Sequence, residues 1–193
     1  MFNSNQTIKI ISVISLCGML YGCGAIVAGT AVSGAVIGQD RRAASTIVYD
    51  KSIQFKAKEV VADVSEGNVK VHVSPVAYNN SVLLVGQVPN KKMRSEIEKE
   101  VRRISKVRRV HNEITVGAPP SSLIRASDSW ITTKIKSEMA VTQDMNPTRV
   151  KVITEDSIVY LMGIVKGEED EIAVDIARHT KGVKKVVKIF EGE

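Results

Sequence analysis

The fold of this chain is decided by the stretch VSPVAYNNSVLLVGQV, residues 73–88. Two apolar runs flank the polar pair Asn79-Asn80, and such a pair favours a tight turn between two strands. The stretch VKVITEDSIVYLMGIV, residues 150–165, repeats the pattern 77 positions later, with Asp156-Ser157 in the place of the turn. The sequence therefore predicts the same β-hairpin twice, and a repeat of this kind indicates two copies of one module.

A helix is predicted after each hairpin, because apolar residues recur there at helical spacing. In the first copy Asn90 can cap the helix start, and the apolar stripe consists of Met93, Ile97, Val101 and Ile104. In the second copy the stripe consists of Ile172, Ala173, Ile176 and Ala177. An apolar-basic-basic-apolar step follows each helix, at residues 107–110 and 183–186, and a short alternating strand comes next, at residues 111–116 and 187–190.

Another helix is predicted before each hairpin. Its apolar stripe in the first copy is Ile53, Ala57, Val60, Val61 and Val64, and in the second copy Trp130, Ile131, Ile135 and Met139. In the second copy the polar residues Ser127, Asp128 and Ser129 are expected to cap the helix start. Each unit therefore has the order α-β-β-α-β. We expect an α+β fold with two tandem modules, each a small three-stranded mixed sheet packed by two helices.

The predicted modules span residues 46–116, the first module, and 125–193, the second module, with a Pro-Pro linker over residues 117–124. Hydrophobic residues make up 44% of the chain but aromatic residues only 4%, so the core is expected to consist of Val, Ile, Leu and Ala. Modules of this size bury little apolar surface alone, so the two are expected to pack together. Gly86 and Gly163 are expected where the backbone packs too closely for a side chain.

The N-terminal segment has the pattern of a lipoprotein signal peptide. Residues 1–22 contain one base and no acid, and their apolar run is too short for a comfortable membrane span. The run ends in Leu20-Tyr21-Gly22-Cys23, in which a small residue precedes the cysteine. Cys23 is therefore the expected lipid attachment site, and Cys17, which follows a large residue inside the apolar run, is the weaker alternative.

Residues 23–45 are expected to form an acylated tether that is rich in small residues. Gly34 and Gly38 also have the spacing that lets helices approach closely, which is the alternative interpretation of this segment. Arg41 and Arg42 are placed to meet anionic headgroups if the tether lies near a membrane. A glycine, not an aspartate, follows Cys23, and among lipoproteins this favours the outer membrane.

The chain carries a formal net charge of +6, which favours anionic partners such as phospholipid headgroups or nucleic acid. Nucleic acid is incompatible with export, so a lipid partner is expected. The three histidines lie far apart without zinc spacing, and no nucleophile elbow, P-loop or dinucleotide fingerprint is found. The acidic run at residues 168–171 suits a helix N-terminus. We therefore expect no enzyme, no metal site and no cofactor.

The apolar-Gly pair that closes each hairpin and the apolar-basic-basic-apolar step together resemble the BON-domain family. The best local matches lie at residues 82–87, 130–134 and 159–163. The resemblance implies a non-enzymatic, periplasm-facing protein, lipid-anchored to the outer membrane, that supports envelope integrity and binds anionic phospholipid of the phosphatidylglycerol kind. By position it implies lipid contacts on the first helix of the second module, at Ser127, Asp128, Ser129, Trp130, Ile131, Thr133, Lys134 and Ser137.

Two other functions remain open from the sequence. A basic body with a tryptophan-bearing helix would also serve a membrane-perturbing, haemolysin-like protein. An adaptor for outer-membrane assembly, division proteins or cell-wall enzymes is the other alternative. Trp130 aligns with Ile53 when the modules are compared, and the absence of a tryptophan there suggests that the first module has a packing role.

Overall fold

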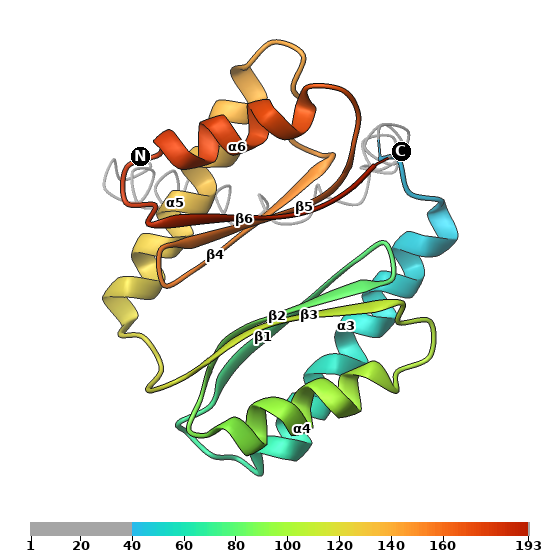
Figure 1. The fold of residues 1–193 in the computed structure, drawn as a ribbon, viewed down its shortest axis with the longest axis vertical. Helices are drawn as coiled ribbons and strands as arrows, with labels where there is room; N and C mark the ends of the chain where they lie inside the picture. The colour runs from blue at the N-terminus through green and yellow to red at the C-terminus, as the bar shows by residue number, and fades with distance from the viewer. Residues whose placement is uncertain (1–39, 193) are drawn as a thin grey trace, which may run out of the picture. The chain divides into compact units, whose positions relative to one another are not determined.

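Both quoted stretches form hairpins in the computed structural model, which describes residues 40–192 (Figure 1). In the first module β1 (His72–Tyr78) runs antiparallel to β2 (Ser81–Val88). In the second module β4 (Val150–Glu155) runs antiparallel to β5 (Ile158–Val165). All four turn residues have positive φ, between 49° and 66°. Short polar side chains tolerate this left-handed region, and the resulting turn matches the twist of the paired strands.

The third strand of each sheet is parallel to the central strand. α4 (Lys91–Arg102) carries the chain from β2 to β3 (Arg109–Val116), and α6 (Glu169–His179) carries it from β5 to β6 (Lys185–Gly192). The strand orders are β1-β2-β3 and β4-β5-β6. The expected fold class, two α-β-β-α-β modules with mixed three-stranded sheets, is therefore confirmed.

The first helix of each module begins earlier than the predicted boundary. α3 runs over Ala44–Ser65 and α5 over Ser122–Val141. The side chain of Ser121 caps α5 by accepting a hydrogen bond from the backbone N–H of Ile124, at 3.3 Å. The expected cap at residues 127–129 is wrong, because Ser121 already supplies the acceptor directly after the Pro-Pro pair and no helix breaker follows it.

The helices cover one face of each sheet (Figure 1). Alternate residues of the central strands, such as Leu84 and Leu161, point at the helices and join their apolar stripes. In the first module this core contains Ile53, Ala57, Val82, Leu84, Val88, Ile97 and Val101. In the second module it contains Ile131, Ile135, Met139, Val159, Leu161, Ala173 and Ala177.

The opposite faces of the two sheets pack against each other. Leu83 and Val85 of β2 form one buried cluster with Tyr160 and Met162 of β5, together with Tyr78. All eight residues of β2 are consequently buried. This contact removes from water the apolar face that each module would otherwise expose, which is the association expected from their small size.

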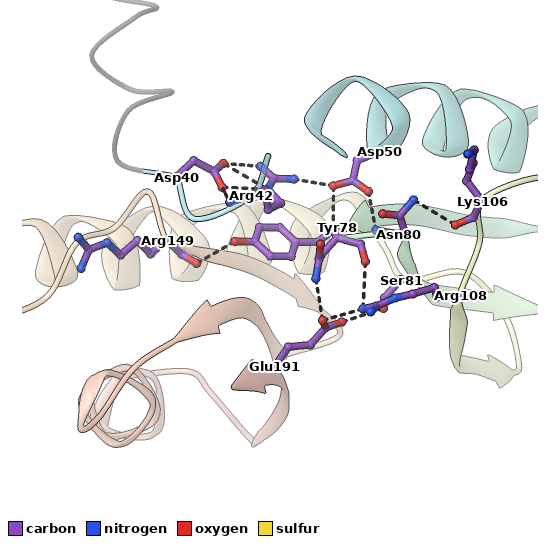
Figure 2. Close-up of polar contacts among 11 residues, drawn as sticks. Asp40, Arg42, Asp50, Tyr78, Asn80, Ser81, Lys106, Arg108, Arg149 and Glu191 are labelled. Carbon is purple, nitrogen blue, oxygen red and sulfur yellow. Dashed lines mark hydrogen bonds and ion pairs between the residues drawn. The ribbon is translucent and has the colours of Figure 1, made fainter. Parts of the chain in front are cut away.

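Polar contacts close the seam between the modules (Figure 2). Glu191 of β6 accepts hydrogen bonds from Asn79 and Arg108 at 2.7 Å and from Ser81 at 3.0 Å. Burial alone would raise the pKa of Glu191, but these donors, Arg108 first, lower it below its usual value. Nearby, the hydroxyl of Tyr78 donates to the backbone oxygen of Arg149, at 3.3 Å.

A buried aspartate holds each hairpin turn. The carboxylate of Asp50 in α3 accepts the N–H groups of both turn residues at 2.8 Å, and Asp128 in α5 does the same in the second module at 2.9 Å. These two residues are therefore equivalent, which places Trp130 opposite Ser52 in the repeat. The expected alignment of Trp130 with Ile53 is wrong, because the chain between helix and hairpin is one residue shorter in the second module.

The glycines of the hairpins lie against the neighbouring strand. A Cβ on Gly86 would stand 1.9 Å from the backbone oxygen of His72, and one on Gly163 would stand 2.6 Å from that of Arg149. Gly86 also has a φ of +125°, which L-residues avoid. The expectation that the backbone packs too closely here for a side chain is confirmed.

Candidate functional site: the exposed face of α5

α5 carries a row of large apolar side chains on its solvent side. Leu123 is 81% exposed, Trp130 52% and Val141 85%. Residues seven and eleven positions apart lie on the same side of a helix, so the three form one line along the helix. We call this row and the polar residues between its members, Thr133, Lys134 and Ser137, the α5 face.

The C-terminal half of the α5 face is hollowed. A shallow depression of about 660 Å³ is lined by Trp130, Thr133, Lys134, Ser137, Glu138 and Val141. The ammonium of Lys134 lies 3.9 Å from the carboxylate of Glu138, and both side chains are about half exposed. A pair this open to solvent contributes little, so Lys134 can exchange Glu138 for another anion. The depression therefore combines an aromatic wall with a cation.

The structure brings together four of the residues that the resemblance implied, namely Trp130, Thr133, Lys134 and Ser137. Ser127 and Ser129 are also exposed but lie beside the row. The other two lie elsewhere. Ile131 is fully buried in the core, and Asp128 is 5% exposed with its carboxylate bound to the hairpin turn. Neither side chain can face a ligand on the α5 face.

Leu123 and Val141 were missed by the sequence reasoning. Leu123 fell within the expected linker at residues 117–124, and Val141 lay beyond Met139, the last residue of the predicted apolar stripe. The signal was present, because both residues share the side of Trp130 once the helix runs from residue 122 to 141. Placing the cap at Ser127 instead of Ser121 hid the first of them.

The two arginines that follow the predicted tether do not face outward. Arg41 forms an ion pair with Glu169 and donates to the backbone oxygen of Ile164 at 3.0 Å. The guanidinium of Arg42 lies 4.1 Å above the ring centre of Tyr78 and is bound to two carboxylates (Figure 2). The expectation that Arg41 and Arg42 meet headgroups is therefore wrong, because both are used to hold residues 40–42 on the body.

The first residue of α6 is a centre of this attachment. Glu169 accepts from Arg149 at 2.7 Å and from the backbone N–H of Lys166 at 2.8 Å, in addition to Arg41. Burial alone would raise the pKa of Glu169, but these hydrogen bonds, Arg41 first, lower it to about 2. The acidic run at residues 168–171 thus opens α6, as expected, and one member also anchors the preceding segment.

The predicted lipid attachment site at Cys23, the predicted signal peptide at residues 1–22 and most of the predicted tether at residues 23–45 lie outside the described residues. Between residues 40 and 192, no helix combines the length and apolar character needed to cross a membrane. In the same part of the chain, no three His, Cys, Asp or Glu side chains are gathered so that they could hold a metal ion.

The chain is similar in sequence to a known family and to several known proteins. Residues 49–118 and 127–191 both match the family model described as BON domain, which confirms the resemblance. The chain is 37% identical over 172 residues to the outer membrane lipoprotein DolP of Haemophilus influenzae, a match that covers 89% of each protein. It is 32% identical over 151 residues to a 21 kDa hemolysin of Actinobacillus pleuropneumoniae, covering 78% of each. An uncharacterized protein of Anaplasma centrale is 32% identical over 108 residues, which cover 55% of this chain and 72% of that protein.

Proposed function

The chain belongs to the BON-domain family, and we propose that it is an outer-membrane lipoprotein whose second module binds anionic phospholipid. In this proposal Cys23 carries the acyl anchor and the body faces the periplasm, where lipid binding supports envelope integrity. The exposed row of Leu123, Trp130 and Val141 on α5 carries the proposal. The similarity to an outer membrane lipoprotein supports the anchored state.

The α5 face has the chemistry of a helix that lies flat on a bilayer. Its apolar row can enter the boundary between headgroups and acyl chains, as in other amphipathic surface helices. Trp130 suits this depth because its ring is apolar and its N–H is polar. Lys134 lies beside the row, and each basic side chain near an anionic membrane contributes about 1 kcal/mol. The charge of Lys134 accounts for a preference for anionic lipid, and the apolar row accounts for attachment to the bilayer.

The first module provides a natural contrast. Ser52 occupies the place of Trp130, while Phe55, one turn further along α3, is 63% exposed and Val48 is 66% exposed. α3 therefore has exposed apolar groups but no tryptophan, and the depression beside it, of about 430 Å³, is lined by neither Val48 nor Phe55. We assign the lipid contact to α5 and use α3 as the control surface.

The test uses the body, residues 40–193, and vesicles with and without phosphatidylglycerol. Trp130→Glu removes the central ring of the α5 face, and Phe55→Glu makes the same kind of change on α3. We expect binding that requires phosphatidylglycerol, falls at least about tenfold in Trp130→Glu and persists in Phe55→Glu. Equal loss in both variants, or no binding by the unmodified body, would refute lipid recognition by α5. Crosslinking to envelope-assembly or division proteins that survives Trp130→Glu would then favour an adaptor.

A second candidate function is membrane perturbation. The observation that favours it is the 32% identity to a protein named as a hemolysin, because an inserted apolar row can also disorder a bilayer. Dye-filled vesicles separate the two functions. Binding without leakage supports the lipid-binding lipoprotein, whereas dose-dependent leakage that Trp130→Glu abolishes supports perturbation.

A further inference from the structure

The internal repeat lets each surface of one module be compared with its counterpart on the other. In the first module Arg42 fills a socket at the base of the hairpin (Figure 2). Its guanidinium donates to Asp50 at 2.7 Å and covers the ring of Tyr78. Asp40 accepts three further hydrogen bonds from this guanidinium, at 2.6, 3.0 and 3.2 Å. We call this arrangement the Arg42 socket.

The second module has the same place without an arginine in it. Asp128 is the counterpart of Asp50, because each holds its hairpin turn. Glu155 is the counterpart of Tyr78, because each is the last strand residue before the turn and pairs with the first residue after it. Here a hollow of about 340 Å³ is lined by both carboxylates, the hydroxyls of Thr132 and Thr154, and the side chains of His72 and Arg125. We call it the Glu155 hollow.

The Glu155 hollow has spare capacity to accept hydrogen bonds. Each oxygen of Asp128 accepts one turn N–H, whereas the matching oxygen of Asp50 accepts both a turn N–H and Arg42. Glu155 accepts only Gln87 at 3.1 Å, with the imidazole of His72 at 3.8 Å. Burial, which outweighs the hydrogen bond from Gln87, raises the pKa of Glu155. A cation placed between these carboxylates would relieve that desolvation.

In the described part of the chain, no arginine takes the place between these carboxylates that Arg42 takes in the first module. Arg42 lies eight residues before Asp50, and the residue eight positions before Asp128 is Pro120. Residues 1–39 contain no arginine. Arg125 lines the hollow, but its guanidinium donates at 2.7 Å to the backbone oxygen of Pro120. Among the described residues, no arginine donates to Asp128 or Glu155, whose donors are the two turn N–H groups and Gln87.

We propose that the Glu155 hollow is a docking socket for an arginine side chain presented by a partner protein. Arginine fits better than lysine, because a planar guanidinium can bridge Asp128 and Glu155 while donating to the threonine hydroxyls. The anionic hollow repels phospholipid headgroups. Thr132 lies two residues from Trp130, about 200° around α5, so a partner can occupy the socket while the α5 face is on a membrane.

The test titrates the full chain, held in detergent micelles, with N-acetyl-arginine amide and follows the methyl resonances of Thr132 and Thr154. N-acetyl-citrulline amide, which has the same shape without the charge, is the matched probe. We expect saturable shifts in the millimolar range with the arginine probe and binding at least about fivefold weaker with citrulline. Equal binding of both probes, or no shift with either, would overturn the proposal without any mutation.

Two variants sharpen the test. Glu155→Gln removes one carboxylate of the hollow and should weaken binding of the arginine probe about fivefold. Glu168→Gln removes an exposed carboxylate elsewhere on the second module and should leave the affinity for the probe unchanged. Unchanged binding in Glu155→Gln would count against the socket. Sedimentation provides a further arm, because dissociation of a self-associated form by the arginine probe would assign the arginine to a second copy of this chain and overturn the assignment to a partner protein.

Discussion

The two modules have the same construction but different surfaces. Each hairpin turn is held by one buried aspartate, and each central strand has a glycine against its neighbour's backbone. Two other positions differ, since the exposed Ser52 stands where the second module has Trp130, and the buried Tyr78 stands where it has Glu155. The residues that build the fold are thus repeated, and the residues of the two proposed binding surfaces have diverged. The positions at which two copies differ therefore indicate where to look for function.

The largest expected effect tests the glycines of the central strands. Gly86→Ala combines a clash with the backbone of His72 and a positive φ, so it should lower the free energy of unfolding by about 4 kcal/mol. In Gly163→Ala the added Cβ has a less severe clash and the φ is not positive, so the free energy of unfolding should fall by about 2 kcal/mol. Urea unfolding followed by circular dichroism measures both. Equal losses would show that the φ of Gly86 is not the source of the difference.

Mutation of the aspartate that holds the turn should cost more stability in the first module, because Asp50 accepts one more hydrogen bond than Asp128. Asp50→Asn should destabilise by about 3 kcal/mol, because the amide cannot accept two turn N–H groups and Arg42 as a carboxylate does. Asp128→Asn weakens only the hydrogen bonds to the turn, so the free energy of unfolding should fall by about 2 kcal/mol. The same urea unfolding serves here. A larger loss for Asp128→Asn would mean that the modules do not use the two residues equivalently.

Glu169 has no counterpart in the first module, where Lys91 is the first residue of α4. The pKa of Glu169 is about 2 in the folded chain, against an ordinary value of 4.5. Its contribution to the free energy of unfolding is therefore full above pH 4.5 and is lost as the pH falls toward 2. We expect Glu169→Gln to lose about 1–3 kcal/mol at neutral pH and to flatten the acid side of the stability profile. Glu168→Gln is the control, and an unflattened profile in Glu169→Gln would contradict the assignment.

The smallest effect concerns the end of the α5 face. Leu123→Ser should weaken binding to phosphatidylglycerol vesicles about fivefold, because part of one leucine side chain leaves the apolar boundary. Val48→Ser makes a similar change on α3 and should leave vesicle binding unaltered. Co-sedimentation with vesicles measures both. A comparable loss in Val48→Ser would assign lipid contact to both modules.

Local features of the fold could be predicted, because their signals lie close together in the chain. The turn pairs at residues 79–80 and 156–157 and the cap at Asn90 each depend on neighbours within a few positions. The start of α5 was misplaced because two sets of capping residues compete there. A propensity argument gave no reason to prefer Ser121, whose position next to the Pro-Pro pair decides the outcome.

The candidate site was only partly predictable. Trp130 and Lys134 were found from residue type and from the resemblance, but the exposure of Leu123 depends on where the helix begins. The roles of Arg41 and Arg42 could not be read from the sequence, because Glu169 lies 128 positions from Arg41. Ion pairs between residues so distant leave no periodic pattern.

The parallel pairing of β6 with β5 has a consequence for how the protein folds. β6 is made after the other five described strands, yet it supplies Val187 and Ile189 to the apolar layer between the sheets and Glu191 to its polar edge. Until β6 has paired, the layer between the sheets lacks Val187 and Ile189 and is incomplete. Contacts between segments as far apart in the chain as β2 and β6 form late, and apolar surface that is exposed until then favours aggregation. A chain in which β6 has not yet paired is therefore expected to be prone to aggregation. Its exposed apolar surface is what chaperones and proteases can recognise, and the folded protein lacks that surface.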